Sequence, residues 1–217
     1  MDVAFIDALS KGTVLGLAAG FSPGPLTVLV ISETLRHGLR AGMKVSLAPV
    51  LTDLPIIALA ALLLDRLASR PAALGVIALL GGGFLLHLGI GSLKPPAVAI
   101  DAVGPAPRSL LRGVTANLLN PNPYIFWIGV GTPILLTAFG RSWTHAAAFA
   151  SAFFFFIVGS KLLLARIVDG SRAFLSGGVY RWVLRILGLL LIVYALVFFR
   201  DGLARIGLYP YLFPGNP

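Results

Sequence analysis

Long apolar runs separated by short polar segments make up most of the chain. Runs of about 20 residues are long enough to cross a hydrocarbon layer of about 30 Å. Because lipid cannot satisfy backbone polar groups, such runs are expected to form helices, whose hydrogen bonds are internal. The predicted spans are residues 11–34, 45–65, 71–93, 112–138, 143–165 and 181–202. The pattern therefore predicts an all-α integral membrane protein with six transmembrane helices.

Paired prolines interrupt two of these spans near their middle. The interruptions are Ser22-Pro23-Gly24-Pro25 in the first span and Asn120-Pro121-Asn122-Pro123 in the fourth. Each proline removes a backbone donor, clashes with the preceding turn and disfavours the α conformation in the residue before it. We therefore expect two broken helices whose freed backbone groups are buried in protein or line a wet cavity. Broken helices in corresponding positions of two halves indicate a transporter's binding site.

A proline-rich stretch divides the chain into two halves. Residues 94–111 are the longest irregular segment and are predicted to form a cytoplasmic linker. The linker separates a first three-helix repeat, residues 1–93, from a second, residues 112–202. Three spans per half place the second half in the opposite orientation, so we expect two inverted repeats. Residues 203–217 are predicted to be a tail along the membrane surface.

Composition supports the membrane class. Hydrophobic residues make up 58% of the 217, and charged residues only 12%. The net charge of +9 does not indicate nucleic acid as a partner, because the basic residues are scattered between apolar runs. Eleven of the 17 Lys and Arg lie on one predicted side, so the positive-inside rule predicts that both termini are outside. Asp2 and Asp7 argue against a cleaved signal peptide, so we expect the first helix to be retained.

Asp53 is the most informative single residue, because it lies about a third of the way into the second predicted span. A carboxylate at such depth costs about 2.5–3.5 kcal/mol on insertion scales, so it needs a partner or a water-filled cavity. Intramembrane acids are functional candidates, through protonation or cation binding. A buried hydrogen bond to the broken backbone of a neighbouring helix is the alternative.

Amides near the second break supply further candidate binding groups. Asn117 and Asn120 are three residues apart and share a helix face, and Asn122 adds a third amide. With Ser22, Gly24 and the exposed main chain, they suit a small zwitterion. Helix N-termini favour its carboxylate and unwound carbonyls its ammonium. Asp53 would hold the ammonium or carry a coupling proton.

Other ionisable residues within the spans have simpler interpretations. Glu33 is expected at headgroup level, and the long stem of Lys161 is expected to reach toward the cytoplasm. His87 is expected to be packed and neutral. Pairing of Lys161 with Asp53 or Glu33 is an alternative that the spacing does not support. The sequence leaves open whether these residues take part in transport.

Enzymatic and metal-dependent functions find little support. The chain has no cysteine, which excludes disulfides, thiolate metal sites and a dithiol relay. The three histidines are dispersed, and no serine–histidine–acid arrangement or phosphate-binding loop is evident. We therefore expect no enzyme activity, cofactor or metal. Glycine ridges such as Gly12, Gly16 and Gly20 fit either a homodimer or packing within one subunit.

The ordered set of motifs resembles the LysE/RhtB-type amino-acid exporters. The residues that carry the resemblance are Ser22-Pro23-Gly24-Pro25, Asp53 and Leu119-Asn120-Pro121. The resemblance implies a bacterial inner-membrane exporter of amino acids or related metabolites, driven by the proton gradient. Many members carry lysine after the Asn-Pro pair and glycine before the acid, where this chain has Asn122 and Thr52. These departures weaken the case for a basic amino-acid substrate.

Three hypotheses follow from the sequence. The preferred one is an alternating-access exporter of a small amino-acid-like solute, with its site between the two breaks. Efflux of an inorganic cation is the second, and it expects more than one carboxylate at the site. A non-transporting membrane assembly subunit is the third, and it expects side chains to fill the breaks.

Overall fold

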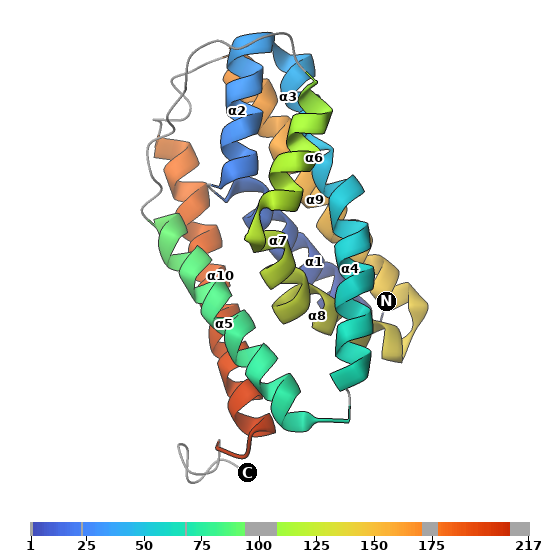
Figure 1. Ribbon diagram of the computed structural model, residues 1–217. Coiled ribbons are helices and arrows are strands. Elements are labelled where there is room, and N and C mark those ends of the chain that lie inside the picture. The colour runs from blue at the N-terminus through green and yellow to red at the C-terminus, as the bar shows by residue number, and fades with distance from the viewer. Residues whose placement is uncertain (1, 23, 68, 94–107, 171–177, 209–217) are drawn as a thin grey trace.

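The computed structural model describes residues 2–22, 24–67, 69–93, 108–170 and 178–208, shown in Figure 1. These residues form helices and no strand. The helices are α1 (Val3–Phe21), α2 (Pro25–His37), α3 (Leu39–Ser46), α4 (Ala48–Leu67), α5 (Pro71–Leu93), α6 (Ser109–Leu119), α7 (Pro121–Phe126), the π-helix η1 (Trp127–Gly131), α8 (Thr132–Arg141), α9 (Trp143–Gly170) and α10 (Gly178–Arg205). The predicted all-helical class is confirmed for this part of the chain.

Five stretches within the described residues are long and apolar enough to cross a membrane. They are Val3–Phe21, Leu39–Leu67, Pro71–Gly91, Asn122–Arg141 and Trp143–Gly170. The sixth predicted span, residues 181–202, falls within α10. Six spans and an inverted repeat remain predictions. Most of the predicted linker and tail, residues 94–107 and 209–217, lies outside the described residues.

Both proline motifs coincide with helix ends. At the first, α1 ends at Phe21, Ser22 has φ −53° and ψ 130°, and α2 begins at Pro25. Pro23 lies outside the described residues. At the second, α6 ends at Leu119 and Asn120 has φ −82° and ψ 125°. Each motif therefore turns the chain out of the α conformation before the next helix starts.

The second motif differs from its prediction in one respect. Asn122 and Pro123 lie inside α7, which begins at Pro121, so only Asn120 leaves the helical conformation. The reason is that the first turn of a helix has no intrahelical partners for its N–H groups, so prolines there remove no hydrogen bond. The Asn120 side chain accepts a hydrogen bond from Asn122 N at 3.1 Å and caps the new helix.

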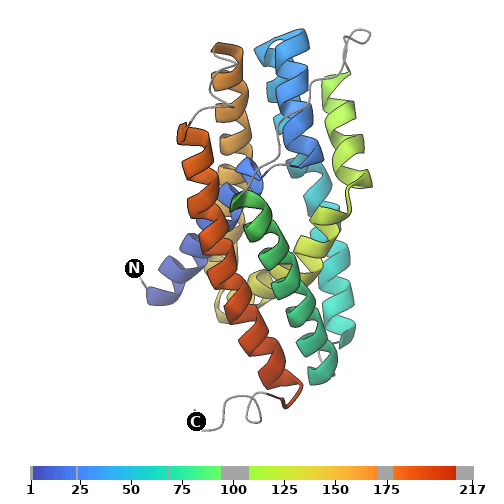
Figure 2. The same cartoon turned by 90° about the vertical axis from the view of Figure 1, so that its left-hand side faces the viewer.

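The helices form an elongated bundle with two distinct ends. One end carries the α2–α3 connection, the start of α6 and the end of α9, and the other carries the α4–α5 connection and the end of α10 (Figure 1). Figure 2 shows α5 and α10 running side by side over most of their length. Helix α1 packs mainly against α9. The two broken helices contact each other through α2 and α6 and through α1 and α8.

Glycines allow these helices to pack closely. A Cβ atom at Gly16 of α1 would lie 2.6 Å from Phe153 O of α9, and one at Gly20 would lie 2.5 Å from Ser160 Cβ. In α5, Cβ atoms at Gly75, Gly82 and Gly89 would lie 3.0, 3.2 and 2.8 Å from carbonyl oxygens of α10. Small residues at such crossings let backbones approach each other. Both glycine ridges are thus used within one subunit.

Substituting Gly16 by alanine is expected to destabilise the protein by about 2 kcal/mol, because the added methyl group meets backbone that cannot yield cheaply. Gly159→Ala in α9 is the matched control, since nothing lies within 4 Å of its would-be Cβ atom. There the change should stabilise the helix by about 0.5–1 kcal/mol. Thermal unfolding in detergent measures both. Equal shifts for the two variants would contradict the packing of α1 on α9.

Candidate functional site

A small cavity lies between the two breaks, with a volume of about 100 Å³. All six residues that the sequence singles out as solute ligands line it: Ser22, Gly24, Asp53, Asn117, Asn120 and Asn122. Its apolar wall includes Leu26, Phe84, Phe126, Phe153 and Ile157. Segments as far apart as α1 and α9 thus contribute to one pocket, which combines polar groups at the breaks with an apolar wall. It is called the central cavity below.

Asp53 is buried at the boundary between α4 and α6. It is 3% exposed, and its Oδ1 accepts hydrogen bonds from Asn117 Nδ2 at 3.0 Å and from Thr52 Oγ1 at 3.1 Å. Asn117 Nδ2 also lies 2.6 Å from Thr52 Oγ1. The partner of Asp53 on the second broken helix is therefore a side-chain amide, and not the broken backbone that the sequence offered as an alternative.

The two breaks present different chemistry to the central cavity. At the start of α7 the Asn120 side chain already caps the helix, whereas Gly24 gives α2 no side-chain cap. The first amides of a helix have no intrahelical acceptor. Gly24, Leu26 and Thr27 all line the cavity. The first break therefore offers donors for an anionic group, and the second offers a neutral amide.

Lys161 lies deep in the bundle, in contrast to the prediction that its stem reaches the cytoplasm. It is 3% exposed and lines the central cavity. Its Nζ donates to Gly20 O at 3.1 Å, to Thr27 Oγ1 at 3.0 Å and to Ala19 O at 3.5 Å. Snorkelling fails because α9 turns this residue toward the break, where freed carbonyls satisfy the ammonium group. The sequence signal was a lone charge in a long apolar run.

Glu33 also differs from its prediction, because it is buried and paired. It is 1% exposed, and its carboxylate oxygens lie 2.7 Å from Arg112 Nη1 and from Ser109 Oγ. The pair joins α2 to α6 beyond the central cavity. Pairing wins over headgroup contact because α6 packs against α2 at this level. His87, expected to be packed, is exposed on α5.

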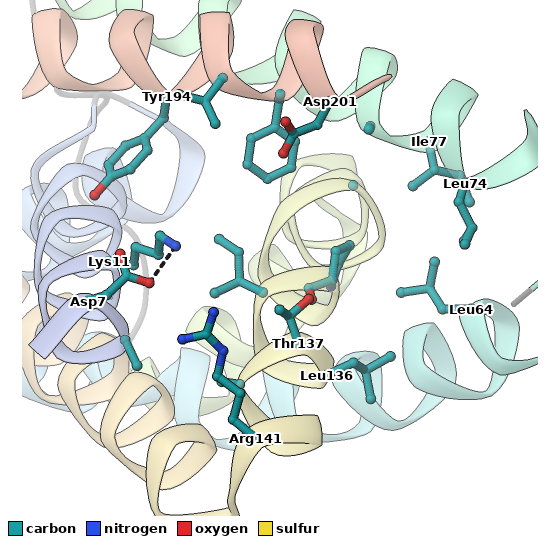
Figure 3. A pocket seen from close by; sticks show the side chains of 18 of the residues that line it. Asp7, Lys11, Leu64, Leu74, Ile77, Leu136, Thr137, Arg141, Tyr194 and Asp201 are labelled. Atoms are coloured by element: carbon teal, nitrogen blue, oxygen red, sulfur yellow. Dashed lines mark hydrogen bonds and ion pairs between the residues drawn. The ribbon is translucent and has the colours of Figure 1, made fainter. Parts of the chain in front are cut away.

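A second, larger cavity opens toward the α4–α5 end of the bundle. It has a volume of about 580 Å³ and is lined by α1, α4, α5, η1, α8, α9 and α10. Figure 3 shows Arg141 and Asp201 extending into it, beside the Asp7–Lys11 ion pair of 2.7 Å. Its charged lining can hold water. We call it the outer cavity, because it opens at the end of the bundle that the distribution of basic residues predicts to face outside.

Apolar side chains separate the two cavities. Along α1, Leu15 lies between Lys11 of the outer cavity and Ala19 of the central one. Leu15 and Trp127 are 1% and 0% exposed and belong to one buried cluster. Along α4, Asp53 and Ala61 are eight residues apart, which is about 12 Å in a helix. A solute would have to displace this layer to pass from one cavity to the other.

A polar contact joins Asp2, which precedes the first span, to His145 on the wall of the outer cavity. Asp2 accepts a hydrogen bond from Ala4 N at 3.2 Å, and its carboxylate lies 3.0 Å from His145 Nε2. The backbone hydrogen bond, followed by the contact with His145, holds the pKa of Asp2 below its usual value. The start of α1 is thereby tied to the start of α9.

Broken helices around a cavity lined by buried charged side chains, in a protein with several apolar spans, are typical of a membrane transporter. The family model of the LysE type translocators matches residues 17–202, which include both breaks, Asp53 and Lys161. The chain therefore belongs to the LysE type translocator family, whose members are membrane exporters of small solutes. This confirms the resemblance found in the sequence. Comparisons with curated proteins and with solved structures gave no match.

Proposed function

We propose that this protein exports small amino acids or related zwitterions across the bacterial inner membrane, coupled to protons. The observation that carries the proposal is that both helix breaks and Asp53 line the same buried cavity. Ser22, Gly24, Asp53, Asn117, Asn120 and Asn122 are the proposed solute ligands. The prolines at 23, 25 and 121 would shape the breaks, and Pro123 lies in the first turn of α7.

The size and lining of the central cavity support a small solute. The volume of the central cavity is about 100 Å³, against about 580 Å³ for the outer cavity. Aromatic and aliphatic side chains form much of the wall. Such a cavity accommodates a short neutral side chain better than that of lysine or arginine. This agrees with the sequence departures at Thr52 and Asn122.

Alternating access would require the two ends of the bundle to open in turn. The outer cavity already reaches toward the central one from the α4–α5 end. At the other end, the Glu33–Arg112 pair holds α2 against α6. We place this paired end in the cytoplasm and both termini outside, as the distribution of basic residues predicts. Asp53 would bind and release the coupling proton, and the two inverted repeats would exchange roles.

The alternatives find less support in the cavity. Among the described lining residues Asp53 is the one carboxylate, whereas an inorganic cation site would gather several oxygen anions. A non-transporting subunit would fill its breaks with side chains, yet a cavity remains between them. A homodimer stays a prediction without a surface assigned to it.

Transport in liposomes tests the proposal. Protein reconstituted with labelled glycine, alanine, serine, leucine, lysine or glutamate inside should release the small neutral solutes fastest when a pH gradient is imposed. We expect alanine efflux at least tenfold above protein-free liposomes, with lysine and glutamate near background. Efflux of none of the six solutes would overturn the proposal, and efflux unaffected by collapsing the gradient would overturn its proton coupling.

A further inference from the structure

Two buried charges of opposite sign line the central cavity without touching each other. Asp53 and Lys161 are each 3% exposed, and the described residues show no ion pair between them within 4 Å. Asp53 is presented by α4 and Lys161 by α9, from opposite halves of the chain. Buried charges that are not paired directly are costly. A ligand between the two side chains that carries both an anionic and a cationic group would compensate both charges.

We propose that Lys161 binds the carboxylate of the transported solute while Asp53 binds its ammonium group. This rests on the proposed function and extends it to a residue that the sequence left unassigned. A zwitterion carries the two complementary charges on neighbouring atoms. Placed between Lys161 and Asp53, it neutralises both charges with no water or counter-ion needed.

The hydrogen bonds of Lys161 show how a carboxylate can enter. An ammonium group has three donors. Lys161 Nζ lies 3.1 Å from Gly20 O and 3.0 Å from Thr27 Oγ1, so two of its donors form short hydrogen bonds. Its distance to Ala19 O is 3.5 Å, which is at the limit of a hydrogen bond. The short bonds hold the side chain in place. The long bond to Ala19 can be exchanged for a charge-assisted bond to a carboxylate oxygen, which is the stronger one.

Neighbouring groups favour the same orientation of the solute. Thr27 Oγ1 donates to Ser22 O at 2.7 Å, so its hydrogen is used and it can accept from Lys161. The uncapped start of α2 lies on the same side of the cavity and favours negative charge. Asn117 and Thr52 both donate to Oδ1 of Asp53, so neither of these hydrogen bonds uses Oδ2. The cavity is thus positive at the first break and negative beside α6.

This charge arrangement gives a specificity rule. A solute with one carboxylate and one ammonium group leaves the cavity neutral. Lysine would add a buried cation and glutamate a buried anion, neither of which meets a further opposite charge on the described lining. A net-neutral α-amino acid is therefore the class of solute that the cavity binds best.

The test compares alanine with two analogues that each lack one charged group. Alaninamide lacks the carboxylate, and lactate lacks the ammonium group. Binding is measured as the ligand-dependent rise in unfolding temperature of the purified protein in detergent. We expect the wild type to bind alanine about ten- to hundredfold more tightly than either analogue, as the loss of a charged hydrogen bond predicts.

Substitutions assign each preference to one residue. Lys161→Gln should abolish the preference for alanine over alaninamide and keep the preference over lactate, whereas Lys161→Arg should retain both in part. Asp53→Asn should abolish the preference for alanine over lactate and keep the preference for alanine over alaninamide. If Lys161→Gln does not fold, the Asp53→Asn variant still tests the inference. It retains Lys161, so it must still bind alanine more tightly than alaninamide.

Different outcomes overturn different claims. Equal weakening of all three ligands in Lys161→Gln would show a structural role alone and overturn the inference. Loss of the preference over alaninamide in Asp53→Asn would overturn it as well, even with alanine still transported by the wild type. Absence of both alanine binding and amino-acid efflux in the wild type would overturn the proposed function together with the inference.

Discussion

Asp53→Asn is expected to lower alanine efflux about ten- to hundredfold while leaving the fold intact. Asparagine has nearly the same shape, and its Oδ1 can accept the hydrogen bonds that Thr52 and Asn117 now donate to the carboxylate. What disappears is the negative charge, and a hydrogen bond to a charged group contributes about 1.5–3 kcal/mol. That energy corresponds to the expected fold-change.

Efflux from liposomes at several imposed pH gradients measures this effect. The residual efflux of Asp53→Asn should no longer respond to the gradient, because the position can no longer exchange a proton. Asp169→Asn is the control, since Asp169 is an exposed carboxylate at the end of α9, away from both cavities. Unchanged rate and pH response in Asp53→Asn would remove Asp53 from the mechanism.

Arg112→Met is expected to destabilise the protein by about 3 kcal/mol. The substitution leaves the carboxylate of Glu33, which is 1% exposed, without its cation, and breaking a buried pair typically costs about 3–5 kcal/mol. We expect the lower end of that range because the Arg112 side chain is 37% exposed and Ser109 still donates to Glu33.

Denaturant titration of the purified variants checks this value. Adding Glu33→Gln to Arg112→Met should recover most of the loss, because no buried charge is then unpaired. Arg166→Met provides the comparison, since its contact with Asp169 is 3.8 Å long and exposed, and such pairs contribute at most about 1 kcal/mol. Equal losses for Arg112→Met and Arg166→Met would contradict a stabilising role of the buried pair.

Local chemistry along the chain predicted the main features of the fold and the position of the central cavity. Hydropathy predicted a chain of apolar helices, and the effect of proline on the preceding residue predicted where α1 and α6 end. Asp53 stood out because a carboxylate inside an apolar run is costly. Each of these inferences depends on a few neighbouring residues, which the sequence shows directly.

The features that were missed depend on contacts between distant segments. Lys161 bonds to Gly20, which is 141 residues away, and Glu33 pairs with Arg112, 79 residues away. Spacing along one helix cannot reveal such partners. The prediction that both side chains reach the membrane surface was therefore wrong. The π-helix at Trp127–Gly131 was also missed, although Pro133 lies just beyond it and leaves Gly129 O without its usual α-helical donor.

The packing of α5 on α10 has a consequence for movement. Gly75, Gly82 and Gly89 recur every seven residues and seat α5 against the backbone of α10 at three levels. Two helices interlocked in this way cannot slide or separate without breaking all three contacts. We therefore expect α5 and α10 to move together as one rigid body during transport. Any hinge is then expected in the segments that connect these two helices to the rest of the bundle.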